Sequence, residues 1–286
     1  MSDCKRLNLP EVVLIEARGP DALRYLNGQL TQDVRLVVSS GKALPSCVTD
    51  AKGRLQYRVI LHAAPDGAIR VSCEHEGAEG LLARLDRYLI ADDATLENIS
   101  ADWIRFHVTG GAPPELPQGG YAVSIDRTGL HGWDLWLPKS ASYAAVEAVE
   151  TWTFEEAETQ RITMGIPAWG SEISPDLLPP EAGLDRTDIS YSKGCYIGQE
   201  VISRIKSAGK VNRRLMRMSV DASASCRSGD RLIDSEGKDA GIITSVAPHA
   251  MNETRVLLGY LKRSVGDQAV FLEKQPSVGV SRLAPA

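Results

Sequence analysis

The sequence of 286 residues is long enough for one large domain or for two to three ordinary domains. Hydrophobic residues make up 43% and charged residues 24%, which is typical of a folded globular chain and excludes an intrinsically disordered one. The 32 basic and 37 acidic residues give a net charge of -5, which argues against nucleic-acid binding through overall charge.

The first part of the chain predicts strands and two amphipathic helices. Strands are predicted by alternating or β-branched runs at 11–17, 44–49, 54–62, 68–73, 95–100 and 103–108. A short helix is predicted after Gly19-Pro20-Asp21, because Leu23, Leu26 and Leu30 then share one side, and a second helix is predicted over 78–90. This order of elements predicts an α+β fold with antiparallel sheets.

Residues 110–120, rich in glycine and proline, form the clearest linker. Further strands are predicted over 121–125 and 133–137, and helices over 142–150 and 155–164. The proline-containing segment 165–187 is predicted to be irregular, which is typical of functional segments. Short β-like runs at 215–220, 231–233, 241–246 and 256–261 predict a small barrel or sandwich. We therefore predict a region of two α+β subdomains over 1–209 and a C-terminal β domain over 210–286.

Membrane and disulfide signals are missing from the sequence. No run of about 18 apolar residues occurs, and no signal peptide is recognisable, so we expect a cytoplasmic protein without membrane contact. The five cysteines are odd in number, widely spread and never in C-x-x-C spacing: Cys4, Cys47, Cys73, Cys195 and Cys226. This pattern predicts reduced thiols and argues against a disulfide framework, a local zinc site or a self-contained iron-sulfur site.

The stretch 193–200, Lys-Gly-Cys-Tyr-Ile-Gly-Gln-Glu, places a cysteine, Cys195, between a lysine and two glycines. A thiol reacts or binds a soft metal as the thiolate, and a nearby ammonium and a helix start both lower its pKa. Lys193 and a helix predicted just after the cysteine supply these two features, so we predict Cys195 as the reactive group and Lys193 as its activator. The alternative is that Gly194 and Gly198 allow a tight turn while Cys195 is a small buried hydrophobic residue.

The segment 201–220 contains no acid but six basic residues: Arg204, Lys206, Lys210, Arg213, Arg214 and Arg217. Such a run is usually a solvated face, and the alternative is a site for a phosphate or an anionic tail. Direct RNA binding is disfavoured, because no aromatic-rich platform accompanies these charges.

The Cys195 motif closely resembles the signature of the YgfZ family of folate-binding proteins, relatives of the glycine cleavage T-protein that include a mitochondrial iron-sulfur assembly factor. Weaker matches follow in the family's order: Leu26-Asn27-Gly28-Gln29-Leu30-Thr31-Gln32-Asp33-Val34, Ala51-Lys52-Gly53-Arg54, Thr128-Gly129 with Gly132-Trp133-Asp134, Arg161 with Gly165-Ile166-Pro167, and Leu178-Pro179-Pro180-Glu181-Ala182-Gly183-Leu184. The resemblance implies a T-protein-like multidomain ring with antiparallel sheets, a tetrahydrofolate channel faced by the motif loop 188–200, and a C-terminal β-barrel.

The resemblance also implies roles for individual residues. Asp134 would accept hydrogen bonds from the 2-amino and N3 groups of a pterin, the alternative being an exposed strand acid. Arg161 would pair with the glutamate tail of folate or hold the ligand loop, the alternative being a helix-surface arginine paired with Glu158. Trp133, Trp136 and Trp169 would offer stacking faces for the pterin, although core packing is the commoner role of tryptophan. Three further motif residues are placed at the ligand: Tyr196, Gln199 and Glu200.

The function implied is that of a tetrahydrofolate-binding accessory protein, rather than a classical enzyme. It would support iron-sulfur cluster assembly or repair, and thereby radical enzymes that thiolate tRNA, with cluster-assembly or client proteins as partners. The alternative is an aminomethyltransferase, in effect a folate-dependent one-carbon transferase. T-proteins carry an Asp pair with the catalytic acid after a Gly-Gly turn, whereas Gly53-Arg54-Leu55-Gln56-Tyr57 has no carboxylate. This disfavours the alternative, because methylene transfer needs a positioned acid or base.

Overall fold

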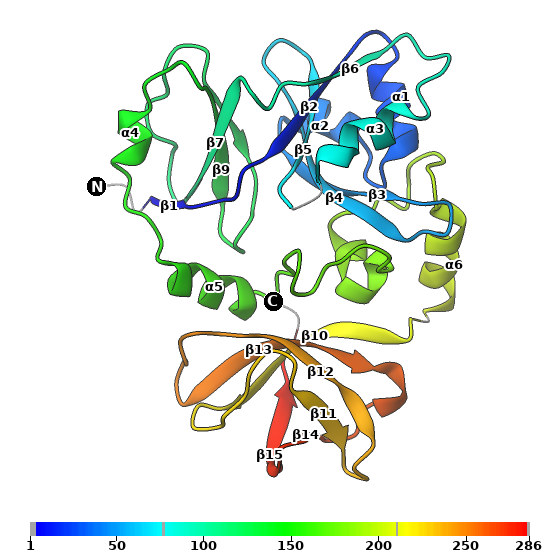
Figure 1. Ribbon diagram of the computed structural model, residues 1–286, viewed down its shortest axis with the longest axis vertical. Coiled ribbons are helices and arrows are strands. Elements are labelled where there is room, and N and C mark those ends of the chain that lie inside the picture. The colour runs from blue at the N-terminus through cyan, green and yellow to red at the C-terminus, as the bar shows by residue number, and fades with distance from the viewer. Residues whose placement is uncertain (1–3, 76–77, 210, 285–286) are drawn as a thin grey trace. The chain divides into compact units, whose positions relative to one another are not determined.

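The computed structural model describes residues 4–75, 78–209 and 211–284 (Figure 1). The chain forms two compact units, and each unit combines two separate stretches of sequence. The first unit contains Met1–Trp152 and Leu184–Ser203, and the second contains Thr153–Gly183 and Arg204–Ala286. The motif around Cys195 therefore belongs to the first unit. The domain boundary that we placed between residues 209 and 210 stays a prediction.

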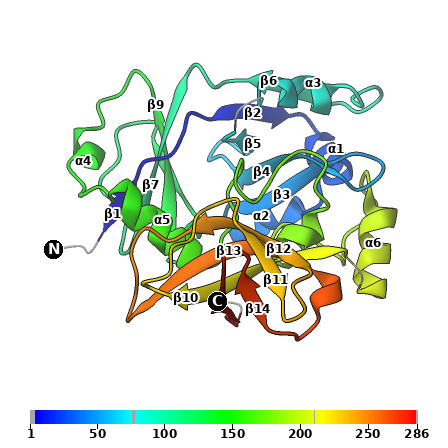
Figure 2. The ribbon, with the colours of Figure 1, turned by 60° about the horizontal axis from the view of Figure 1, so that its bottom comes forward.

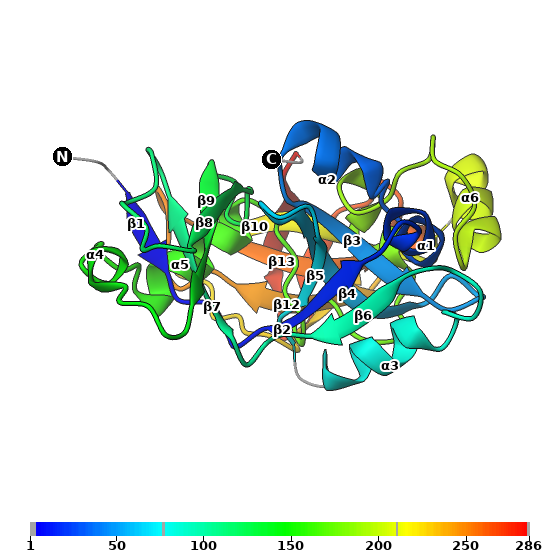
Figure 3. The ribbon, with the colours of Figure 1, turned by 90° about the horizontal axis from the view of Figure 1, so that it is seen from above.

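A five-stranded antiparallel sheet forms one half of the first unit, in the order β3-β4-β5-β2-β6. Its strands are β2 (Val13–Arg18), β3 (Leu44–Thr49), β4 (Leu55–Ala63), β5 (Ile69–Cys73) and β6 (Thr95–Asn98). Figure 3 shows three helices beside this sheet, namely α1 (Ala22–Gln29), α2 (Arg35–Ser40) and α3 (Leu81–Asp86), the last preceded by the 3-10 turn η1 (Ala78–Gly80).

The two faces of this sheet differ in polarity, because successive side chains in a strand point to opposite faces. One face carries apolar residues such as Ile15, Leu61 and Val71, which pack in a single core with residues of the three helices. The opposite face carries polar residues at neighbouring positions, among them His62 and Arg70, which are paired across β4 and β5. Both of these polar side chains are nevertheless buried.

A four-stranded antiparallel sheet forms the other half of the first unit, in the order β1-β7-β9-β8 (Figure 1). Its strands are β1 (Lys5–Leu7), β7 (Trp103–Thr109), β8 (Tyr121–Ser124) and β9 (Gly132–Pro138), followed by the short helix α4 (Ala144–Glu147). Leu14 of the first sheet and Trp136 of the second belong to one buried apolar cluster. The buried polar side chains therefore lie next to an apolar contact between the two sheets.

The second unit is built around a closed antiparallel barrel of six strands (Figure 2). The strands are β10 (Arg213–Asp221), β11 (Arg231–Asp234), β12 (Asp239–Val246), β13 (Thr254–Lys262), β14 (Val270–Leu272) and β15 (Gln275–Arg282), with the turn η4 (Arg263–Val265). Helix α5 (Phe154–Thr163) begins with a capping box between Thr153 and Glu156 and buries Ile162 against Leu258 of the barrel. The turn η2 (Pro179–Ala182) completes this unit.

The motif segment lies between the turn η3 (Leu184–Arg186) and helix α6 (Gln199–Ala208). The helix expected just after the cysteine is therefore confirmed. Among the residues that the structure describes, no helix combines the length and the apolar character needed to cross a membrane.

Candidate functional site

Cys195 is exposed, whereas Lys193 and Tyr196 of the same motif are buried. Lys193 is 6% exposed and Tyr196 is 7% exposed, and Tyr196 packs with Ile189 and Ile202 in a small apolar cluster. Cys195 is thus not the buried hydrophobic residue of the alternative interpretation. The motif divides into buried side chains that attach the loop and a thiol that faces solvent.

The ammonium of Lys193 attaches the motif loop to the end of helix α1. Its Nζ donates to three backbone carbonyls, those of Asn27 at 2.6 Å, Leu30 at 2.7 Å and Gln32 at 2.8 Å. Carbonyls in the last turn of a helix lack partners within the helix, and this end carries partial negative charge. A cation therefore suits this position. Lys193, which is distant in sequence, caps the C-terminal end of helix α1.

Burial lowers the pKa of Lys193 to about 8. The amine therefore remains mostly protonated at neutral pH, as three simultaneous hydrogen bonds require. These bonds direct the ammonium to the backbone of residues 27–32. The structure therefore gives Lys193 a role in attaching the loop, and its predicted effect on the thiol of Cys195 stays a prediction.

Backbone contacts fix the loop directly after the thiol. The N–H of Ile197 donates to the Gly28 carbonyl at 3.2 Å, and the Thr49 hydroxyl donates to the Ile197 carbonyl at 2.6 Å. Gly198 has a φ of +88°, and a Cβ atom there would lie 2.5 Å from the Asp50 carbonyl oxygen. Only glycine meets both conditions, so the predicted tight turn is confirmed at Gly198.

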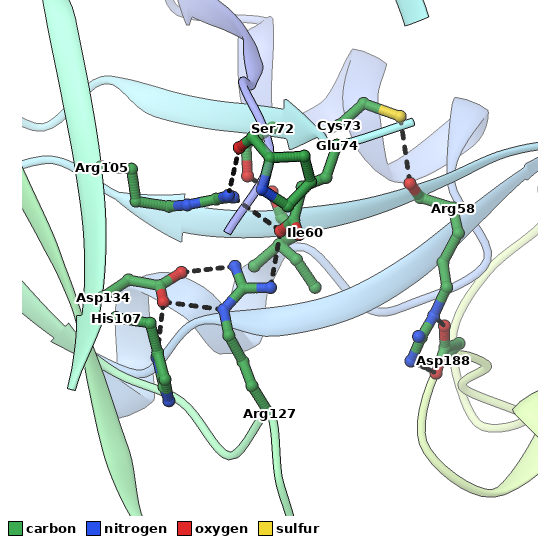
Figure 4. A network of polar contacts seen from close by, with 11 residues as sticks. Arg58, Ile60, Ser72, Cys73, Glu74, Arg105, His107, Arg127, Asp134 and Asp188 are labelled. Carbon is green, nitrogen blue, oxygen red and sulfur yellow. Dashed lines mark hydrogen bonds and ion pairs between the residues drawn. The ribbon is translucent and has the colours of Figure 1, made fainter. Parts of the chain in front are cut away.

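The start of the loop is held by a buried ion pair. Asp188, whose side chain is fully buried, accepts from Arg58 of β4 at 2.7 and 3.3 Å (Figure 4). The Thr31 hydroxyl donates to the Asp188 carbonyl at 2.6 Å, and the Ser190 N–H donates to the Thr31 carbonyl at 3.0 Å. The loop is therefore fixed at its start by charge and at its end by backbone geometry.

Asp134 lies in a second cluster of charged residues in the first unit (Figure 4). Its carboxylate is 1% exposed and accepts from Arg127 through Nε at 2.7 Å and through Nη2 at 2.6 Å. His107 lies 2.9 Å from the same carboxylate through Nδ1. Burial lowers the pKa of His107, so the ring is neutral at neutral pH and Nδ1 donates. Asp134 is thus not the exposed acid of the alternative interpretation.

The pKa of Asp134 predicts a loss of stability in acid. Burial by itself would raise this pKa, but Arg127 and the hydrogen bonds from Arg127 and His107 hold it well below its usual value. A carboxyl whose pKa is lower in the folded state stabilises the fold above its unfolded pKa, and this contribution is lost as the pH falls below about 4. Wild type should therefore lose up to about 1.4 kcal/mol more per pH unit than Asp134→Asn, measured by urea denaturation. The exposed Asp102→Asn variant should keep the wild-type slope, and identical slopes for wild type and Asp134→Asn would contradict the ion pair.

Of the three tryptophans predicted as stacking faces, Trp136 shares a strand face with Asp134. Asp134 and Trp136 are two residues apart in β9 and so share a face, on which His107 and Arg105 are their cross-strand partners. Trp133 lies on the opposite face, and its Nε1 donates to the Gly111 carbonyl at 3.1 Å. Stacking of a ligand on Trp133 therefore stays a prediction, and Trp136 is the tryptophan on the Asp134 face.

Arg161 belongs to the second unit, where its guanidinium is only 12% exposed. It donates to Glu158 at 2.8 Å, to Glu172 at 3.0 Å, to the Ser245 hydroxyl at 3.0 Å and to the Ile166 carbonyl at 2.8 Å. The pairing with Glu158 is present, but Arg161 is not a surface residue. Of its two predicted roles, these contacts favour holding the segment after helix α5.

The remaining predicted residues occupy different environments. Tyr196 is buried in its apolar cluster, Gln199 is half-buried and Glu200 is exposed at the start of α6. The structure therefore brings neither Tyr196 nor Glu200 into the Asp134 cluster. Arg127, His107 and Glu74 make up that cluster and were missed, because no spacing in the sequence relates residues on three separate elements.

Two alternatives from the sequence concern the start of β4 and the basic run. At the start of β4, the Gln56 side-chain carbonyl accepts from Arg84 Nε at 2.6 Å. In the basic run, Arg213 pairs with Glu181 at 3.1 Å, and Arg217 donates to the Thr163 carbonyl at 2.7 Å. Lys210 lies outside the described residues. These internal contacts disfavour one continuous phosphate site along the run.

The chain is similar to two groups of named proteins. It is 28% identical over 239 residues to "Iron-sulfur cluster assembly factor IBA57, mitochondrial" from Mus musculus, which covers 73% of the chain and 64% of that protein. It is 27% identical over 233 residues to "tRNA-modifying protein YgfZ" from Serratia proteamaculans, which covers 73% of the chain and 69% of that protein. The chain thus spans less than two thirds of the length of the mouse relative. No protein-family model matches.

The fold matches a solved structure along almost the whole chain. The glycine cleavage system aminomethyltransferase T from Bartonella henselae aligns with a TM-score of 0.84 at 19% identity, over 99% of this chain and 86% of that chain. At this identity the likeness establishes the fold alone. The predicted α+β, T-protein-like fold with antiparallel sheets and a C-terminal barrel is confirmed.

Proposed function

Because this chain is a relative of the IBA57 and YgfZ proteins, we propose that it is an accessory protein in iron-sulfur cluster assembly or repair. The observation that carries the proposal is the contrast between the exposed Cys195 and the buried residues that fix its loop. A thiolate is the usual protein ligand of iron in such clusters. A thiol on a fixed, exposed loop can reach a cluster or a thiol that a partner protein carries.

The effect on tRNA is proposed to be indirect. The bacterial relative is named a tRNA-modifying protein, but the basic run of this chain forms internal contacts with Glu181 and the Thr163 carbonyl. We therefore propose that cluster-dependent enzymes, such as radical enzymes that thiolate tRNA, are the clients that depend on this protein.

We also propose a reduced folate as a ligand of the first unit, which the T-protein-like fold supports. The hydrogen bonding of Asp134 fits a pterin. Both oxygens of its carboxylate accept from the planar N–C–N group of Arg127. The 2-amino and N3 groups of a pterin present the same pair of parallel N–H donors. A bound folate would add a group that carries one-carbon units, and Asp134 would orient its ring.

Aminomethyl transfer is a weaker candidate. The strand that would supply its acid begins with Leu55, Gln56 and Tyr57, and the Gln56 amide is bound by Arg84. An amide held in this way cannot exchange protons with the folate nitrogens.

The proposal predicts that Cys195→Ser abolishes function in cells without changing the fold. The activity of cluster-dependent enzymes should fall to that of cells lacking the protein, because serine removes the sulfur ligand but retains the size of the side chain. The matched control is Cys226→Ser, which alters a half-buried cysteine of the barrel and should retain activity. Normal enzyme activity with Cys195→Ser would overturn the proposed role of the thiol.

A further inference from the structure

We propose that Arg127 guards Asp134, so that its guanidinium must leave the carboxylate before the pterin edge of a reduced folate can bind there. This inference rests on the proposed folate binding. It follows from a conflict in the structure, since the carboxylate predicted to recognise the pterin is already paired through both of its oxygens.

The guanidinium of Arg127 resembles the pterin edge in its hydrogen bonding. Its Nε and Nη2 donate in parallel to Oδ1 and Oδ2 of Asp134, at 2.7 and 2.6 Å. The N3–H and 2-amino groups of a pterin are likewise two donors on a planar N–C–N unit. The two groups would satisfy the same acceptor in the same way, so they compete for Asp134.

Arg127 can move away from Asp134 without leaving Glu74, its other partner, unpaired. Its Nη1 also donates to Glu74 at 2.6 Å, but Glu74 accepts from Arg105 at the same distance. Glu74 therefore stays paired when Arg127 moves. Arg127 lies in the turn between β8 and β9, just before Gly129 with its φ of +76°, whereas Asp134, His107 and Arg105 lie in strands. The mobile partner is thus expected to be the arginine.

Further buried polar atoms lie on the same strand face as Asp134. Within the described part of the chain, Arg105 Nε, Trp136 Nε1 and His107 Nε2 are buried without a hydrogen-bond partner. Their residues are 8%, 0% and 0% exposed and lie on the same face of β7 and β9 as Asp134. Buried polar atoms in native proteins are nearly always paired, so this group of three points to a polar occupant.

The hydrogen-bonding requirement of the buried Asp134 carboxylate determines which occupant can replace Arg127. A buried carboxylate that loses its cation destabilises the folded protein strongly. The ligand must therefore donate two hydrogen bonds to Asp134 in place of those from Arg127. A pterin with its 2-amino group meets this requirement, whereas an analogue with a 2-oxo group presents an acceptor to the carboxylate. Because the ligand has to compete with Arg127 for Asp134, it needs the 2-amino group in order to bind.

The test is calorimetric titration of the full chain with 5-formyltetrahydrofolate. Arg127→Lys keeps the positive charge but cannot form the two-donor fork, so the ligand should bind about tenfold more tightly than to wild type. Asp134→Asn should bind much more weakly, because one acceptor oxygen is lost. Arg186→Lys, an exposed arginine elsewhere in the first unit, should bind as wild type.

If Arg127→Lys binds the ligand as wild type does or more weakly, with an unchanged melting temperature, the proposed competition by Arg127 is wrong. The proposal of folate binding would still stand. If neither wild type nor any variant binds, the folate proposal fails and the guard fails with it. A second readout does not depend on any variant: the ¹⁵N NMR signal of the Arg127 Nε–H in wild type. It should shift towards that of a solvated arginine when the ligand saturates the protein, and an unchanged signal would overturn the guard.

Discussion

Replacing Arg58 by methionine is expected to lower the free energy of unfolding of the first unit by about 3 to 5 kcal/mol. The substitution leaves the fully buried Asp188 carboxylate without its cation, whereas the Thr187 hydroxyl, at 2.6 Å, still donates to it. Urea denaturation followed by tryptophan fluorescence measures the effect. Fluorescence reports mainly the first unit, because that unit contains four of the five tryptophans, Trp103, Trp133, Trp136 and Trp152.

The matched control is the double variant Arg58→Met with Asp188→Leu. Replacing both members of a buried ion pair by apolar residues is often neutral or stabilising, so the double variant should recover most of the lost stability. A double variant as unstable as Arg58→Met alone would show that the loss comes from packing of the arginine and not from the unpaired charge.

Replacing Lys193 by methionine is expected to cost about 3 kcal/mol or more, because each unpaired buried carbonyl costs roughly 1 to 3 kcal/mol. The carbonyls of Asn27, Leu30 and Gln32 would lose the ammonium together, at the end of helix α1. The loop that carries Cys195 should detach, so proteolysis near that loop should become faster. Both changes are measurable, by denaturation and by mass spectrometry of the early fragments.

Lys52→Met is the control for this variant, since Lys52 is an exposed lysine in the turn before β4. It should leave both stability and the cleavage rate as in wild type. A Lys193→Met protein with wild-type stability would mean that the three carbonyls are satisfied by solvent and that the cap is dispensable.

Local patterns in the sequence predicted most of the secondary structure. The strand expected over 44–49 is β3 (Leu44–Thr49), and the helix expected over 155–164 is α5 (Phe154–Thr163). Helix α2 (Arg35–Ser40) and strands β1, β14 and β15 were missed. The helix has only six residues, which is too short for a periodic pattern, and the stretch 275–282 contains the strand-disfavouring Pro276 and Gly279. The formation of α2, β14 and β15 depends on the helix–sheet core and on closure of the barrel.

The sequence by itself determined the fold class, the position of the Cys195 motif and the turn at Gly198, because each depends on residues that are close along the chain. Only the tertiary structure decided that Lys193 binds the end of helix α1, that Asp134 is paired with Arg127, and that Cys195 faces solvent. Hydrogen bonds and ion pairs depend on which groups meet within about 3 Å, and elements far apart in sequence bring those groups together.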